Sequence, residues 1–259
     1  MMAYPEKYYP PVTPQSVQVC SIQFSKTDRI RINGIPNFPE NLIPIVRTAI
    51  ETGWTKGIQS EGDFHGAYEF KVSGNPWLGR TEDGVNARRL LSSILLHLAR
   101  EGWVHLQSFD PSKKSNDKDT MFFEYQQPDP EAQMFAISFN DTDKIRLIDT
   151  PSSSSWLLDT FRDTVTSSWP KGVQDERDYY GCSEIKLKGN PWFTSDGEQS
   201  IAAKLLLCQL IGAFRKIGYK LYASVDITGR WGNAASGGNS PTENDLDVWV
   251  LRRVTSIWY

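Results

Sequence analysis

Features of secreted and membrane proteins are scarce in this sequence. Only three of its 259 residues are cysteine (Cys20, Cys182 and Cys208), and their spacing is neither that of a metal site nor that of a disulfide framework. The N-terminus lacks a basic segment followed by an apolar one, and no apolar run approaches the roughly 18 residues that cross a bilayer. We therefore expect a cytoplasmic protein with three free, buried thiols and no membrane partner.

An excess of charge of one sign is also missing. The sequence has 28 lysines and arginines against 31 aspartates and glutamates, and its pI is about 5.7. A surface that follows nucleic-acid phosphates needs a basic excess, since neutralising phosphates supplies most of that affinity. The composition therefore predicts no nucleic-acid partner.

Signatures of catalysis are absent as well. The sequence contains no G-x-S-x-G nucleophile elbow, no P-loop, no H-E-x-x-H and no paired C-x-x-C motif. Its three histidines, His65, His97 and His105, are not arranged as metal ligands. We expect no catalytic residue, no metal site and no cofactor, and the sequence leans towards a protein that is not an enzyme.

What the sequence does contain is a repeat. KGIQSEGDFHGAYEFKVSGNPW, from Lys56 to Trp77, returns 115 residues later as KGVQDERDYYGCSEIKLKGNPW, from Lys171 to Trp192. The similarity extends in both directions, so the chain is an internal duplication. We expect a flexible tail over residues 1–16, a first repeat over 17–127 and a second over 132–259, together forming a monomer with pseudo-twofold symmetry.

Each repeat has the hydrophobic pattern of an α+β domain. Leu42, Val46, Ile50 and Trp54 recur at helical spacing, and a second helical stripe runs through residues 87–98. Between these helices the residues alternate as in a β-hairpin, and further strands flank them. The order predicts a tandem duplication of a ferredoxin-like two-layer sandwich, β-α-β-β-α-β plus an extra strand, in which two helices cover one sheet face.

The other sheet face is where we expect a ligand site. Period-two alternation predicts that mixed charges and amides point outward there. In the first repeat these outward residues are Arg29, Arg31, Gln59, Glu61, Glu69 and Lys71, and in the second they are Lys144, Arg146, Gln174, Glu176, Glu184 and Lys186. Such faces are either solvated, self-neutralising surfaces or the walls of a polar cleft between the two sheets.

Nine tryptophans make the chain tryptophan-rich. Trp54 and Trp77 recur as Trp169 and Trp192 beside core residues, which predicts core anchors. Trp231 lies in a glycine-rich loop, residues 227–244, and is the tryptophan that we expect to contact a ligand.

Three functions fit these patterns. The first is an intracellular, non-enzymatic binding protein that presents a composite surface to a protein or a small polar ligand. The second is a small-molecule enzyme of the pseudo-dimeric α+β barrel type, with its cleft between two facing sheets, and this rests on fold analogy alone. The third is a lectin-like protein that binds carbohydrate through the Trp231 loop.

Overall fold

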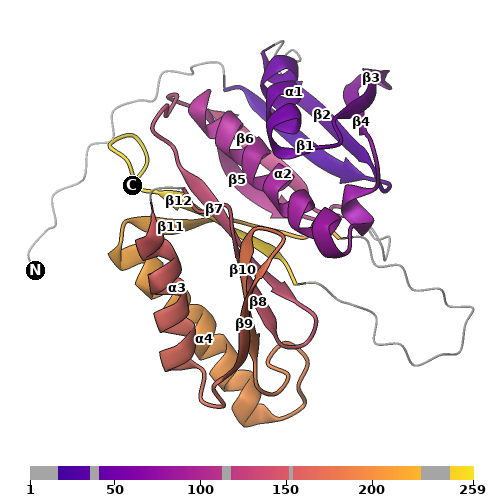
Figure 1. The fold of residues 1–259 in the computed structure, drawn as a ribbon. Helices are drawn as coiled ribbons and strands as arrows, with labels where there is room; N and C mark the ends of the chain where they lie inside the picture. Colours follow the sequence, from indigo (N-terminus) through magenta and orange to yellow (C-terminus); the bar gives the residue numbers. More distant parts are fainter. Residues whose placement is uncertain (1–16, 36–40, 113–117, 152–153, 229–245) are drawn as a thin grey trace, which may run out of the picture.

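The computed structural model describes residues 17–35, 41–112, 118–151, 154–228 and 246–259 (Figure 1). The first half contains β1 (Val19–Ser25), β2 (Arg29–Ile35), α1 (Leu42–Gly53), β3 (Ile58–Phe64), β4 (Ala67–Val72), a short 3-10 turn (Pro76–Leu78), α2 (Thr81–Arg100), β5 (Trp103–Phe109) and β6 (Thr120–Tyr125). The second half contains β7 (Met134–Asn140), β8 (Lys144–Ile148), α3 (Ser155–Ser168), β9 (Val173–Tyr179), β10 (Cys182–Leu187), α4 (Gly197–Lys216), β11 (Tyr219–Val225) and β12 (Val248–Arg253).

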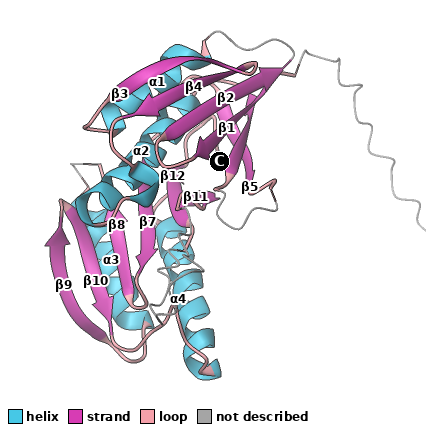
Figure 2. Ribbon diagram, turned by 90° about the vertical axis from the view of Figure 1, so that its right-hand side faces the viewer, coloured by secondary structure: helices cyan, strands magenta, loops and turns pink. Residues whose placement is uncertain are grey.

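Each half is a six-stranded antiparallel sheet with two helices on one face (Figure 2). The strand order is β3-β4-β2-β1-β6-β5 in the first sheet and β11-β12-β7-β8-β10-β9 in the second, so corresponding strands hold corresponding places. The predicted α+β fold with two similar halves is confirmed. Within the described part of the chain, no helix combines the length and apolarity needed to cross a bilayer.

The helices form where the apolar stripes predicted them. Leu42, Val46 and Ile50 on α1 are fully buried, as are Leu157, Phe161 and Val165 on α3. Burying each of these side chains contributes about 1.5–3 kcal/mol, which exceeds any intrinsic helix propensity. The helical period of the sequence therefore fixes which side of each helix faces its sheet.

The repeated stretch that marks the duplication is a β-hairpin followed by a tryptophan anchor. Both hairpins turn through two residues with positive φ, His65-Gly66 and Tyr180-Gly181, as the tight turns that match strand twist require. The indole N–H of Trp77 then donates to the carbonyl of Arg29 at 3.1 Å, and that of Trp192 donates to Lys144 at 2.9 Å. The repetition therefore serves the fold, because each half needs the same anchor.

A β-bulge corrects the predicted orientation of two glutamates. The register of β3 on β4 shifts between Ile58 and Ser60, so the extra residue Gln59 reverses the alternation beyond it. Glu61 consequently stands opposite the core residue Phe70 and faces the helices. A matching shift at Gln174 turns Glu176 towards α3. The expectation that these glutamates point outward was wrong.

Helix α2 lies between the two sheets. One side of α2 packs on its own sheet, and the other contacts β7 and β8 of the second half (Figures 1 and 2). A single core joins α2 residues such as Leu91 and Leu95 to Ala136, Ile148 and Val250 of the second sheet. The sheets therefore do not face each other, and the predicted cleft between two facing sheets is not formed.

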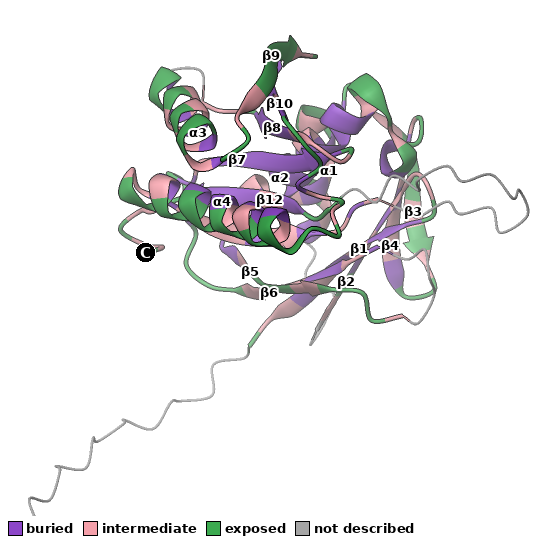
Figure 3. Cartoon of the chain, turned by 90° about the horizontal axis from the view of Figure 1, so that it is seen from below, coloured by how far each residue is buried: buried purple, intermediate pink, exposed green. Residues whose placement is uncertain are grey.

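The packing of the halves also departs from twofold symmetry. Helix α2 is buried on both sides, whereas α4, its counterpart, has exposed residues along its outward side (Figure 3). The first half contributes α2 to the contact, and the second half contributes the face of its sheet that α3 and α4 do not cover. This head-to-tail relation corrects the expected pseudo-twofold arrangement. Cys208 on α4 is likewise exposed, whereas burial was expected for all three thiols.

Polar links close the contact between the halves. Arg89 on α2 donates to the Asp149 carboxylate and to the Tyr180 carbonyl, at 2.8 and 2.9 Å. Elsewhere Asp129 and Arg252, each 1 % exposed, form an ion pair at 2.7 Å. Because Asp129 lies between the halves in sequence, this pair fixes the connection to the last strand.

Candidate functional site

The uncovered face of the first sheet carries the predicted charges as ion pairs. Arg31 Nε lies 2.7 Å from Glu69 Oε2, and an Arg29 guanidinium nitrogen lies 3.5 Å from Glu69 Oε1. Lys71 lies 4.0 Å from Asp28, which also pairs with Arg29 at 3.2 Å. Such ion pairs are worth about 0–1 kcal/mol each, and they pair the opposite charges of this face with one another. Ligand binding there stays a prediction.

The corresponding pair in the second sheet is buried. Arg146 lies 2.6 Å from Glu184, and their side chains are 8 % and 2 % exposed. Arg177 is also bonded to Glu184, at 2.6 Å, and the Arg146 guanidinium lies over the ring of Tyr179. Lys144 pairs with Asp141 and Lys186 pairs with Asp143. These contacts hold the second sheet together. Trp231 lies outside the described residues.

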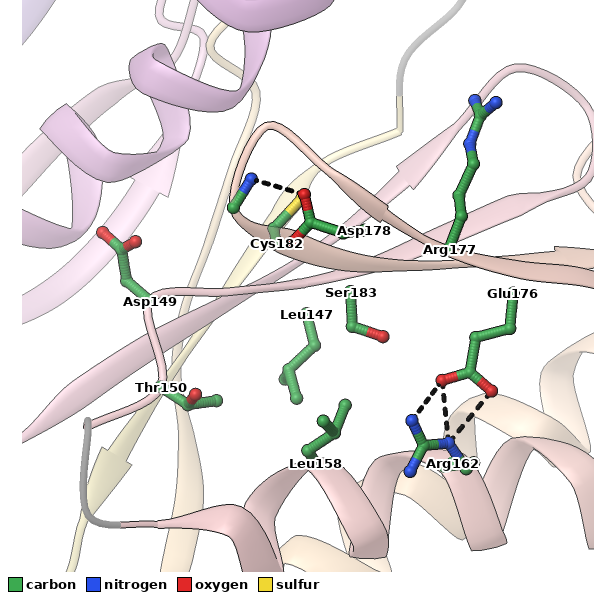
Figure 4. Close-up of a pocket in the computed structure, with 11 residues that line it drawn as sticks. Leu147, Asp149, Thr150, Leu158, Arg162, Glu176, Arg177, Asp178, Cys182 and Ser183 are labelled. Carbon is green, nitrogen blue, oxygen red and sulfur yellow. Dashed lines mark hydrogen bonds and ion pairs between the residues drawn. The ribbon is translucent and has the colours of Figure 1, made fainter.

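A cavity of about 610 Å³ opens in the second half, on the side of the sheet that faces α3 (Figure 4). We call it the Ser183 pocket. It is lined by Leu147, Asp149, Thr150, Leu158, Arg162, Glu176, Arg177, Asp178, Gly181, Cys182 and Ser183. Strands β8, β9 and β10 supply one wall and α3 supplies the other. Glu176 was predicted from the sequence to belong to a ligand site, but on the opposite face of the sheet.

The charged groups around this pocket already have protein partners. Arg162 forms hydrogen bonds of 2.5 to 2.9 Å with both carboxylate oxygens of Glu176, and these bonds raise the pKa of Arg162. Asp149 is held by Arg89, and Asp178 accepts from the Gly181 amide. Arg177 extends away from the cavity towards Glu184 (Figure 4). A ligand here would therefore gain most if it carried no net charge.

The Ser183 hydroxyl is a polar group in the pocket wall that lacks a hydrogen-bond partner among the described residues. Its oxygen is buried. Leaving such a group unsatisfied costs about 1–3 kcal/mol. Neighbouring Leu147 and Leu158 provide an apolar surface (Figure 4). Burial raises the pKa of the Cys182 thiol to about 11, so this thiol is protonated at neutral pH.

The first half shows what fills the same position there. Tyr68 pairs with Ile32 and Asp63 across its sheet, as Ser183 pairs with Leu147 and Asp178. The Tyr68 side chain lies close enough to Arg47 and Glu61 to raise the pKa of Arg47 and to lower the pKa of Glu61.

Arg47 and Glu61 are the counterparts of Arg162 and Glu176, bonded at 2.6 to 3.2 Å. The hydrogen bonds from Arg47 hold the pKa of Glu61 below its usual value, and the nearby Tyr68 has a smaller effect in the same direction. The second half thus has the same polar pair without the phenol beside it.

Two sequence signals could have identified this pocket. The alignment of the repeats places Ser183 opposite Tyr68, a large loss of side-chain volume at a position facing the helices. Arg47 and Arg162 also align, and each directly follows a residue of the core stripe, Val46 or Phe161. Neither signal could be used without the bulge, which brings the glutamates to these arginines.

The remaining candidates occupy structural positions. Trp54, Trp77 and Trp169 are at most 2 % exposed, which confirms them as core anchors, and Trp192 is partly buried. His65 is exposed in its turn, whereas His105 is packed against Phe123 and Tyr222. Within the described ranges, no three His, Cys, Asp or Glu side chains gather as a group that could hold a metal ion.

Comparisons with known proteins agree with the duplication. No curated protein matches the chain. One structural match is a crystal structure described as a conserved kinetoplastid-specific protein from Trypanosoma cruzi, with 16 % identity and a TM-score of 0.29 over 42 % of this chain and 95 % of that one. A family model that describes a single domain matches residues 18–124 and again residues 133–252. The chain therefore belongs to this domain family, and it carries the domain twice.

Proposed function

We propose that the chain is a non-enzymatic binding protein and that the Ser183 pocket receives a neutral 4-hydroxyphenyl group, such as the tyrosine side chain of a protein partner. One observation carries this proposal. The first half places its own Tyr68 beside the Arg47–Glu61 pair, at the position where the second half has Ser183 and a cavity.

The chemistry of a phenol matches the lining of the pocket. Its hydroxyl both donates and accepts, so it can donate to the Glu176 carboxylate while accepting from Arg162 without breaking their ion pair. Its ring would lie against Leu147 and Leu158, where burial of an aromatic ring is favourable. A phosphorylated or carboxylated ring would bring negative charge towards Glu176 and Asp178, and we expect it to be rejected.

The size and position of the cavity also support binding. Its volume of about 610 Å³ falls within the roughly 300–1,000 Å³ of ligand pockets. Its rim is held from the first half, because Arg89 on α2 bonds to Asp149 and to the carbonyl of Tyr180. The two-domain arrangement thus supports the site, which depends on both halves.

Calorimetric titration with N-acetyltyrosinamide tests the proposal. We expect one molecule bound per chain, weaker binding of N-acetylphenylalaninamide, and no binding to a Ser183→Tyr variant, whose new side chain occupies the pocket. A Ser183→Ala variant should still bind, because the pocket stays open and Glu176 and Arg162 are unchanged.

The matched control is Ser167→Tyr, which adds a tyrosine at an exposed position of α3, on the side of the helix away from Leu158 and Arg162. This variant should bind as the wild type does. Binding that is unchanged in Ser183→Tyr would contradict the proposal, as would a wild-type chain that binds neither compound at millimolar concentration.

We also propose a cytoplasmic location. Cys208 is exposed and free, and Cys20 and Cys182 are unpaired, a state that a reducing compartment maintains. Fractionation of cells that produce the tagged chain should recover it with the cytosol, and recovery in a secreted or organellar fraction would contradict this location.

A further inference from the structure

Helix α4 carries a second apolar stripe that does not face its sheet. Its core side consists of Ala203, Leu206, Leu210 and Phe214, which are at most 6 % exposed. On the outward side Ile201 is 67 % exposed and Leu205 is 54 % exposed. Cys208 and Gly212 continue this line and are also exposed. The spacing of four, three and four residues places all four on one face of the helix.

The duplication allows this face of α4 to be compared with the equivalent face of α2. The counterparts of Ile201, Leu205, Cys208 and Gly212 on α2 are Val85, Arg89, Ser92 and Leu96. In that stripe Arg89 bonds to Asp149 of the second half, and Val85 and Ser92 are buried. The exposed stripe of α4 is therefore the second copy of an interface that is already used once within the chain.

A sheet face of another copy is a poor match for this stripe. In the contact that covers α2, the second sheet offers apolar Ala136, Ile148 and Val250. The corresponding positions of the first sheet are Ser21, Asn33 and Phe122, and Arg31 and Glu69 lie beside them on the same face. Covering apolar side chains with this polar face would leave charged groups desolvated, so head-to-tail continuation into a filament is disfavoured.

The stripe fits a second copy of itself. We propose that α4 pairs in antiparallel orientation with α4 of a second copy of this chain, about a twofold axis that passes between residues 206 and 207. This axis places Leu205 opposite Cys208 of the second copy and Ile201 opposite Gly212. Apart from the backbone of α4 itself, no atom of the described residues lies within 4 Å of the place that a Cβ would take at Gly212, so the other helix can approach closely there.

The charges at the two ends favour the same orientation. Glu198 lies in the first turn of α4, and Arg215 and Lys216 lie in its last turn. In an antiparallel pair Glu198 stands opposite Arg215 of the second copy, since the two are equidistant from the axis. A parallel pair would bring like charges together and would align the helix dipoles unfavourably. The chain is then a dimer, where the sequence predicted a monomer.

Sedimentation equilibrium of the full chain tests this pairing. We expect a concentration-dependent mass approaching twice 29.4 kDa for the wild type and a monomer for Leu205→Lys. The control Thr166→Lys introduces the same charge on an exposed position of α3 and should dimerise normally. A wild-type chain that stays monomeric at 200 µM, or a dimer that persists in Leu205→Lys, would overturn the proposal.

Two further measurements test the orientation and do not depend on whether Leu205→Lys folds. Glu198→Arg and Arg215→Glu should each weaken the dimer, and the double variant should restore it, because the exchanged charges again face each other. Failure of this restoration would overturn the antiparallel pairing.

In the dimer the two Cys208 thiols lie about 4.5 Å apart along the helix direction, close enough for a short bismaleimide to join them. Cys20 and Cys182 are buried, so a cross-linked dimer that disappears in Cys208→Ser supports the axis. Absence of the cross-link in the wild type would contradict it.

Discussion

Tyr68 and Ser183 occupy the same register position in the two sheets, each one strand away from a glutamate bonded to a helix arginine. The first half fills this position with its own phenol, and the second half leaves a cavity. Duplication kept the surrounding Arg–Glu pair in both halves. The two halves therefore share this pair and differ in the side chain beside it.

Replacing Tyr68 by serine should create a second site. The variant removes an aromatic side chain that packs partly buried against the core of the first half. We expect it to lower the free energy of unfolding by about 2–4 kcal/mol, as large-to-small core substitutions do. Calorimetry should then report two molecules of N-acetyltyrosinamide per chain where the wild type binds one.

The matched control for this prediction is Tyr68→Phe, which removes only the hydroxyl and keeps the position filled. It should bind a single molecule, like the wild type. A Tyr68→Ser variant that stays folded and still binds only one molecule would show that the two positions are not equivalent.

His105 should make stability fall in acid. This residue lies on β5 between the halves, where its amide donates to the Tyr222 hydroxyl at 2.8 Å. Burial lowers the pKa of the imidazole to about 4 from an ordinary value near 6.5. The unfolded chain therefore binds more protons between these values. The contribution of His105 to stability is complete above pH 6.5 and is lost as the pH falls towards 4.

Urea unfolding of the wild type and of His105→Leu between pH 4 and pH 7.5 measures this contribution. Leucine is the residue at the aligned position 221 of the second half. On acidification the wild type should lose on the order of 3 kcal/mol more than the variant. Burial raises the pKa of Asp119 to about 6, so Asp119 acts in the opposite direction and remains in both proteins. Parallel pH profiles for the two proteins would contradict the prediction.

The buried pair of Asp129 and Arg252 should tolerate joint replacement better than single replacement. Both side chains are 1 % exposed, and Arg252 also lies over the rings of Tyr222 and Trp258. Arg252→Met leaves the Asp129 carboxylate buried without its partner, so we expect a loss of about 3–5 kcal/mol.

The double variant Asp129→Asn with Arg252→Met should recover at least half of that loss, since no uncompensated charge stays buried. Urea unfolding of the four proteins gives the coupling between the two residues. Additive losses would show that the ion pair contributes nothing beyond the packing of each side chain.

The sequence was sufficient to predict the fold of each half. The apolar stripe through Leu42, Val46 and Ile50, and its repeat in α3, can be buried only if each helix packs that side against its own sheet. The sequence was insufficient to predict the contact between the halves. Nothing in a single repeat shows that α2 is buried on two sides, since Arg89 and Ser92 make its outer stripe more polar than the exposed stripe of α4.

The candidate site was missed for a local reason. Strict alternation turns Glu61 and Glu176 outward, and only the bulges at Gln59 and Gln174 turn them towards Arg47 and Arg162. A bulge adds one residue without a distinctive sequence pattern, so every residue beyond it is assigned to the wrong face.

The exchange variant Tyr68→Ser with Ser183→Tyr tests the central claim most directly, with methyl resonances as the readout. In the wild type, N-acetyltyrosinamide should shift the methyl signals of Leu147 and Leu158 in the second half. In the exchange variant these signals should stay in place, and those of Ile32 and Ile43 in the first half should move instead. A ligand that shifts the same methyl groups in both proteins, or in neither half of either protein, would contradict the claim that this one position decides where a phenol binds.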